Sequence, residues 1–192
     1  MDSYPGIRSR HRGTNLSRPA YLKDFRRGVG ENPFTYAAEY PAGVPMVKRA
    51  RPRYRLLPHM TDAYVEVQGP TLNAAFEAAA FAMFDVMTDP TAVGLEFTDR
   101  LEVTAHDEVS LLHDWLEQLL LKFDLDGKVY SRFEVEKIAA RDGGLHLEAK
   151  AHGGLFQPGR HPAKVEIKAV TYHRMEVTAT GKGYLVRYIL DL

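Results

Sequence analysis

The feature that most constrains the fold is a run of seventeen residues, 161–177, in which side chains alternate between two faces. A period of two predicts a β-strand with one buried face. A strand usually has roughly 5–6 residues, so we expect one long strand, or two strands separated by an irregularity near Ala169-Val170. Because a β-bulge would exchange the faces downstream, the direction of His173 stays open. One face carries Val165, Ile167, Ala169, Thr171, His173, Met175 and Val177.

The rest of the chain is predicted to add two helices and several strands. A helix over residues 72–87 follows the N-cap candidate Thr71 and ends before Pro90. A second helix begins near residues 107–108, whose acidic side chains suit a helix N-terminus. Strands are expected at residues 54–67, 97–105, 129–139, 145–152 and 184–192, with a hairpin signal at residues 141–144.

This order of elements predicts an α+β protein. A β-α-β-α start followed by a run of strands places two helices on one face of a mainly antiparallel, six- to seven-stranded sheet. The first helix carries an apolar stripe of Met and Phe, and the sole tryptophan, Trp115, lies in the apolar stripe of the second. We interpret both stripes as core rather than as ligand contacts.

Composition and motifs exclude several classes of protein. The 192 residues contain no cysteine, which removes disulfides, thiolate catalysis and zinc–thiolate sites. No apolar run approaches ~18 residues and the N-terminus has no apolar signal core, so we expect a soluble, cytoplasmic protein without a membrane segment. The sequence lacks metalloprotease, P-loop, dinucleotide-binding and serine-hydrolase motifs, which indicates that the protein is not a stand-alone enzyme.

The net charge of zero hides an uneven distribution of charge. Residues 1–53 contain 11 Lys and Arg against 4 Asp and Glu, whereas residues 54–192 contain 14 against 21. Gly and Pro interrupt the first segment throughout, so we predict a basic, mostly disordered N-terminal extension before a folded domain over residues 54–192. The extension contacts RNA phosphates, is a solvated tail, or results from a start codon placed too early. Its aromatic residues either dock on the domain or stack on bases, and they are Tyr21, Phe25, Phe34, Tyr36 and Tyr40. Removal of the extension should leave the melting temperature nearly unchanged.

Two aspartates near opposite ends of the domain are candidate metal ligands. Asp62 lies in an apolar strand three residues after His59, and Asp191 is followed by the C-terminal carboxylate of Leu192. A carboxylate in an apolar strand is unfavourable unless it is paired or coordinates a cation. Oxygen ligands suit calcium or magnesium better than zinc. The alternatives are that Asp62 caps a turn or pairs with Lys168.

A second set of polar side chains, most of them in the alternating run, is a candidate patch that faces a partner or a phosphate. Its members are His59, His161, Lys168, Tyr172 and His173, with Lys164 beside them. The alternative is ordinary exposed decoration of a strand, and for His173 a buried histidine. We interpret His113 and Glu117, one helical turn apart, as a solvated pair.

Four segments, taken together, resemble the archease family. In the alternating run, His161-Pro162 followed by the segment from Val165 to His173 resembles the family's late strand. Residues 57–63 resemble its opening strand, residues 74–89 its first helix, and residues 186–192 its hydrophobic C-terminus, which ends in an aspartate and one aliphatic residue. The resemblance covers about residues 54–192 and implies an archease-like α+β fold.

In this family a divalent ion, often calcium, is held by the early-strand aspartate, the penultimate aspartate and the last residue. The resemblance therefore implies a site formed by Asp62, Asp191 and Leu192, with calcium as the expected ion and magnesium or manganese as alternatives. The sequence departs from the pattern at Pro58, where the family has an acidic residue, and at Thr61, where it often has Ala or Ser. These departures spare the three named ligands.

Archeases activate the RtcB-type GTP-dependent RNA ligase, so the resemblance implies an accessory role. The protein would promote guanylylation of the ligase and multiple turnover in tRNA splicing and RNA repair, without being an enzyme itself. The alternative is a small RNA-binding or chaperone-like module that works through the basic extension and the sheet. A metal-dependent hydrolase is the weakest interpretation, because no general base stands out.

Overall fold

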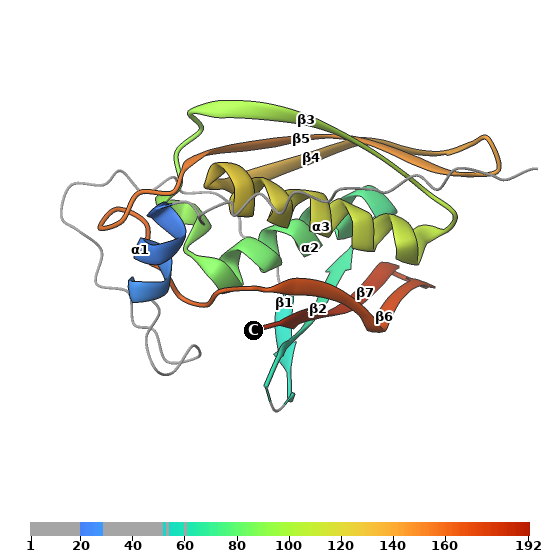
Figure 1. The fold of residues 1–192 in the computed structure, drawn as a ribbon. Helices are drawn as coiled ribbons and strands as arrows, with labels where there is room; N and C mark the ends of the chain where they lie inside the picture. The colour runs from blue at the N-terminus through green and yellow to red at the C-terminus, as the bar shows by residue number, and fades with distance from the viewer. Residues whose placement is uncertain (1–19, 29–51, 53, 60) are drawn as a thin grey trace, which may run out of the picture.

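The computed structural model describes residues 20–28, 52, 54–59 and 61–192 (Figure 1). Its helices are α1 (Ala20–Gly28), α2 (Leu72–Met87), the 3-10 helix η1 (Pro90–Ala92) and α3 (Glu108–Asp126). Its strands are β1 (Tyr54–Leu57), β2 (Ala63–Gly69), β3 (Phe97–Ala105), β4 (Lys128–Arg141), β5 (Gly144–Leu155), β6 (Ala169–Thr180) and β7 (Gly183–Asp191).

The strands form two antiparallel sheets with α2 and α3 between them (Figure 1). One sheet has the order β1-β2-β7-β6 and the other the order β3-β5-β4. α2 contacts β2 and β7 on one side and β4 on the other, whereas α3 contacts β6 and β3. The predicted α+β class, the antiparallel pairing and the two central helices are confirmed. The strands divide between two sheets, however, and the helices lie between the sheets rather than on one face of a single sheet.

α2 is buried on all sides because it is covered by both sheets, as expected for an apolar helix in a protein core. It begins at the predicted N-cap, where the Thr71 hydroxyl accepts a hydrogen bond from the backbone N–H of Ala74 at 3.1 Å. The fully buried Trp115 of α3 donates its indole N–H to the carbonyl of Phe76 at 3.2 Å. This bond satisfies the one polar atom of the tryptophan and connects α3 to α2, so the predicted core role of Trp115 is confirmed.

The predicted hairpin between β4 and β5 is confirmed. Asp142 and Gly143, the two central residues of the turn, have φ angles of 50° and 83°. Positive φ at both central positions defines the type I′ turn, which matches the twist of the paired strands. Gly144 packs tightly, because a Cβ atom there would lie 2.4 Å from the carbonyl oxygen of Ala105. The hairpin is thereby held against the end of β3.

The alternating run of residues 161–177 forms a strand only from Ala169 onward. Before Ala169 the chain is extended outside the ladder, yet the predicted alternation persists, with Val165 and Ile167 buried. The buried face then changes between Ile167 and Val170, which confirms the irregularity expected near Ala169-Val170. A second, unpredicted irregularity shifts the register of β6 and β7 between residues 171 and 176. His173 lies within this second irregularity and is exposed.

Part of the N-terminal extension is folded onto the domain as α1, an ordered segment within an extension that is predicted to be mostly disordered. Phe25 is fully buried, and its ring contacts those of Phe123 and Phe156 at centroid distances of 5.1 and 5.0 Å. The Tyr21 hydroxyl donates to the carbonyls of Phe123 and Asp124, both at 2.7 Å, at the C-terminal end of α3. Residues 1–19 and 29–51 lie outside the described residues.

None of the described helices combines the length and the apolar character needed to cross a membrane.

Candidate functional site

Antiparallel pairing brings the two predicted metal-binding aspartates together at one end of the β1-β2-β7-β6 sheet. Ala63 of β2 pairs with Leu190 of β7, so Asp62 and Asp191 occupy the next pair of positions. Ala169, the first residue of β6, pairs with Asp191 from the other side. The start of β2, the end of β7 and the start of β6 therefore meet at one place, which we call the Asp62–Asp191 cluster.

Asp62 is oriented by the histidine that precedes it. Its Oδ2 lies 3.2 Å from Nδ1 of His59, and both side chains are 23% exposed. The His59 ring in turn meets Tyr64 edge-on, with a centroid distance of 6.3 Å and an interplanar angle of 73°. Asp62 and His59 are therefore neighbours, and Tyr64 of β2 limits the rotation of the His59 imidazole.

Lys168 holds the chain end at this cluster. Its backbone N–H donates to the carbonyl of Asp191 at 2.8 Å, and its ammonium donates to a main-chain oxygen of Leu192. The alternative pairing of Asp62 with Lys168 is not what the structure shows, since Lys168 contacts Leu192 and Asp62 contacts His59.

Two buried polar atoms beside the cluster lack hydrogen-bond partners within the described part of the chain. They are Nδ1 of His59, which is near Asp62 but out of hydrogen-bond alignment, and Oγ1 of Thr171. Thr171 pairs with Ile189, two residues before Asp191, so its hydroxyl lies close to the same strand ends. Buried polar groups are normally satisfied by protein, water or ions, so both atoms favour an additional polar ligand in this region.

The cluster fits a hard divalent cation by donor type. The carboxylates of Asp62 and Asp191 and a main-chain oxygen of Leu192 supply oxygen atoms, which calcium and magnesium prefer. Across residues 20–28, 52, 54–59 and 61–192, no group of three His, Asp or Glu side chains is placed to hold a metal. A site here would therefore take a main-chain oxygen of Leu192 as its third protein ligand, and Lys168 would have to share that oxygen with the ion.

The residues of the predicted patch do not share one surface. His161 is 3% exposed, and its Nδ1 accepts a hydrogen bond from the backbone N–H of Gln157 at 3.0 Å. Burial, and then the nearby Arg160 guanidinium, lower the pKa of His161. His161 is therefore a core histidine near Phe156, and its predicted role in a partner-facing patch is wrong.

The other members lie in separate environments. The Lys164 ammonium donates to Oδ1 and to the carbonyl oxygen of buried Asp85, both at 2.8 Å. Tyr172 is 54% exposed and stacks on His113 of α3, with a centroid distance of 4.0 Å and an interplanar angle of 10°. His59 and Lys168 belong to the Asp62–Asp191 cluster, as described above.

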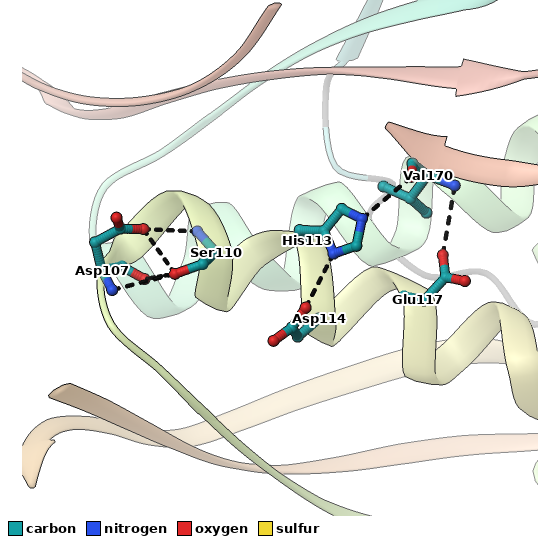
Figure 2. A network of polar contacts seen from close by, with 6 residues as sticks. All are labelled: Asp107, Ser110, His113, Asp114, Glu117 and Val170. Carbon is teal, nitrogen blue, oxygen red and sulfur yellow. Dashed lines mark hydrogen bonds and ion pairs between the residues drawn. The ribbon is translucent and has the colours of Figure 1, made fainter. Parts of the chain in front are cut away.

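His113 and Glu117 form a structural contact that the sequence interpretation missed. Figure 2 shows both side chains reaching from α3 to the backbone of Val170 in β6. His113 Nε2 lies 3.2 Å from the Val170 carbonyl oxygen, and Glu117 Oε2 accepts from the Val170 N–H at 3.5 Å. Nδ1 of His113 contacts Asp114 at 2.9 Å. The spacing of four residues placed both on one helical face, but nothing local indicated that β6 would lie opposite.

A row of alternating charges across the first sheet was also missed. Arg55, Glu66, Arg187 and Glu176 pair in register on β1, β2, β7 and β6. Glu66 is 3% exposed and accepts from Nε of Arg55 and from Nε of Arg187, each at 2.9 Å. The hydrogen bonds of Arg55, followed by those of Arg187, lower the pKa of Glu66 despite its burial. This charged row fixes the register that aligns Asp62 with Asp191.

These features define the class of protein: a small α+β domain in which β2 pairs with the last strand, β7, and places Asp62, just before β2, beside Asp191 at the end of β7. Residues 54–192 match the model of the Archease protein family, and the chain belongs to this family. It is 44% identical over 131 residues to the protein archease of Methanothermobacter thermautotrophicus, covering 68% of this chain and 92% of that protein. The protein archease of Methanosarcina mazei is 37% identical over 140 residues, covering 73% and 96%.

A solved structure supports the same assignment. The solution structure of a Methanobacterium thermoautotrophicum protein superposes with a TM-score of 0.66 at 41% identity. The superposition covers 72% of this chain and 98% of that protein. The family fold therefore accounts for residues 54–192, and α1 lies outside the part matched by the family model.

Proposed function

We propose that the protein is an accessory activator of an RtcB-type, GTP-dependent RNA ligase in the cytoplasm. In this role it promotes guanylylation of the ligase and multiple turnover in tRNA splicing and RNA repair. The observation that carries the proposal is the Asp62–Asp191 cluster, where two carboxylates and the chain end meet in a member of the archease family. The protein itself neither hydrolyses nucleotides nor joins RNA in this proposal.

The cluster would act by presenting oxygen ligands at the surface of the protein. Asp62, Asp191 and the Leu192 carboxylate would hold a divalent ion, with calcium expected and magnesium or manganese as alternatives. A divalent ion, when bound, supplies positive charge that stabilises a transferring phosphoryl group. His59 orients Asp62, and Lys168 keeps the chain end beside Asp191.

Lys168 has a second consequence for the same site. Its ammonium partly neutralises the terminal carboxylate, and it is exposed enough to move. When a partner brings its own metal or phosphate to the cluster, Lys168 can release the Leu192 oxygen and turn toward the phosphate. The cluster is in this way suited to a site shared between two proteins.

A turnover assay tests the proposal. An RtcB-type ligase is mixed with GTP, a divalent metal and an excess of RNA ends, and the number of joined products per ligase is counted with and without this protein. We expect a single-turnover reaction to become a multiple-turnover one when the protein is added. Asp191→Asn should abolish the gain, whereas Asp126→Asn should keep it, because Asp126 is a 53% exposed carboxylate at the end of α3.

Ligase turnover that is the same with and without the protein, across several metals and RNA ends, would refute the accessory role. Melting temperatures of both variants should be measured beside the assay, so that a loss of activity is assigned to the cluster only when the domain is folded.

A further inference from the structure

A second region of interest lies at the end of the molecule opposite α1, between the two sheets (Figure 1). There the β4–β5 turn, the N-terminus of α3 and the irregular part of β6 enclose a cleft of about 360 Å³. Its lining includes His106, Ser110, Asp114, Arg141 and Tyr172. Sites for small molecules usually measure about 300–1,000 Å³, so the cleft is large enough for one compact ligand. None of the Asp62–Asp191 cluster lines it.

Tyr172 forms an aromatic platform in this cleft. One side of its ring is stacked on His113, yet 54% of the residue remains exposed. Tyr172 lies within the second irregularity of β6, where Arg174 has a φ of 54°. A non-glycine residue with positive φ is uncommon and persists where the surrounding structure holds it. The backbone around Tyr172 therefore departs from the geometry of a regular strand.

The platform is held rigidly from behind. His113 contacts Asp114 through Nδ1 at 2.9 Å and the Val170 carbonyl oxygen through Nε2 at 3.2 Å (Figure 2). Both ring nitrogens of His113 therefore have a polar partner within hydrogen-bond distance. The imidazole is then fixed in its plane and supports the Tyr172 ring at 4.0 Å. A ligand that stacks on Tyr172 would not need to order the platform first.

Polar groups of both charges surround the platform. The Asp114 side chain is 44% exposed and can accept hydrogen bonds from N–H groups of a ligand. The Arg141 side chain is 62% exposed beside the β4–β5 turn, where its Nε lies 3.6 Å from Oδ2 of Asp142, and its guanidinium suits a phosphate. The Asp107 carboxylate, by contrast, already accepts hydrogen bonds from the backbone N–H and the hydroxyl of Ser110 at the N-cap of α3. One flat aromatic surface and one acceptor suit a base that carries an amino group, and one guanidinium suits a phosphate.

We propose that this cleft binds a nucleobase, which stacks on the exposed side of Tyr172. The base belongs to a nucleotide or to single-stranded RNA, with Asp114 accepting from its amino group and Arg141 contacting a phosphate. Stacking on an aromatic side chain tolerates any base. The Asp114 carboxylate favours bases with an exocyclic amino group over uracil. The inference does not depend on ligase activation, because it rests on a different surface.

Binding of defined nucleotides to the full-length protein tests this inference. The probes are the four nucleoside monophosphates and short single-stranded homopolymer RNAs, followed by fluorescence anisotropy and by NMR signals of the Tyr172 and His113 rings. Tyr172→Ala should weaken binding by about 5- to 140-fold, which corresponds to the stacking energy of one base. Tyr172→Phe should retain binding, because it keeps the ring. The matched control Leu121→Ala removes a 52% exposed side chain of α3 outside the cleft and should have no effect.

Two further variants separate the parts of the ligand. Asp114→Asn should remove the preference for amino-bearing bases over uridine monophosphate, and Arg141→Gln should weaken all phosphorylated probes to a similar degree. RNA that binds more tightly than its matching monophosphate identifies a strand as the ligand. Equal affinities identify a free nucleotide.

The inference is overturned by either of two results. The first is the absence of saturable binding by every monophosphate and RNA at millimolar concentration. The second is binding that Tyr172→Ala leaves unchanged. If Tyr172→Ala fails to fold, shifts of the Tyr172 and His113 ring signals in the unmodified protein decide the question. Ring signals that do not move on addition of a binding nucleotide place the ligand elsewhere and also overturn the inference.

Discussion

Replacing Phe25 by alanine tests whether α1 belongs to the folded domain. The Phe25 ring is 0% exposed and packs edge-on against Phe123 of α3 and Phe156 after β5. Removing it leaves a cavity between these two rings, or it releases α1 and exposes both of them. Either response lowers the free energy of unfolding.

The size of the loss follows from the burial of the ring. Truncation of a buried phenylalanine to alanine costs about 3–5 kcal/mol. For a chain of this size, 1 kcal/mol corresponds to roughly 2–4 °C in melting temperature. We therefore expect Phe25→Ala to lower the melting temperature by about 6–20 °C. The lower end applies if α1 detaches, because the loss is then limited to the free energy with which α1 docks.

Circular dichroism during heating measures this change, and limited proteolysis within α1 reports whether the helix has detached. Lys23→Ala is the matched control, since Lys23 is exposed on the same helix. Deletion of residues 1–50 should lower the melting temperature at least as much as Phe25→Ala, contrary to the expectation from sequence. A change below about 2 °C in both variants would show that α1 is not part of the stable domain.

Three further predictions concern the cluster, the core histidine and the charged row. Calcium should raise the melting temperature by mass action, and Asp62→Ala should abolish this rise, which differential scanning fluorimetry measures; a rise that persists would place the ion elsewhere. Burial lowers the pKa of His161 below its ordinary value of 6.5, so the unfolded chain binds the proton more readily. The free energy of unfolding should therefore fall as the pH drops below 6.5, and denaturant titrations of His161→Asn should show a weaker dependence. Glu66→Ala should lower the free energy of unfolding by about 1–2 kcal/mol, because it removes charge-assisted hydrogen bonds. Glu136→Ala, at an exposed ion pair, should change it less; equal effects would contradict the importance of the charged row.

Local patterns in the sequence were enough to predict the individual elements. The N-cap at Thr71 and the turn at Asp142-Gly143 are encoded within a few residues, and both were predicted correctly. The division of the strands between two sheets depends on which distant strands pair, and periodicity carries no information about that. α1 was missed because its three anchoring side chains, Tyr21, Leu22 and Phe25, lie in a segment dominated by Arg, Gly and Pro.

The candidate site was only partly predictable, because sequence patterns give the position of a residue in its strand but not the elements that lie next to it. Asp62 and Asp191 stood out as acids in apolar strands, and their juxtaposition follows from the register of β2 and β7. His161 was assigned to a surface because the alternation gave its position but not the neighbours that bury it. The stacking of Tyr172 on His113 depends on a register shift in β6 that no sequence motif predicts.

The pairing of β2 with β7 also decides when the Asp62–Asp191 cluster can exist during synthesis. Glu66 and Arg187, which meet across these strands, are 121 residues apart in the chain. The β3-β5-β4 sheet and α3 need only residues 97–155 and can form while the chain is still growing. The flank of α2 that faces β2 and β7 is only partly covered, by β2, until β7 has left the ribosome. Contacts this distant in sequence form slowly and leave apolar surface exposed in the interval. A chain truncated before β7 would therefore lack the cluster. It would also expose apolar surface of α2, which chaperones and proteases recognise on nascent proteins.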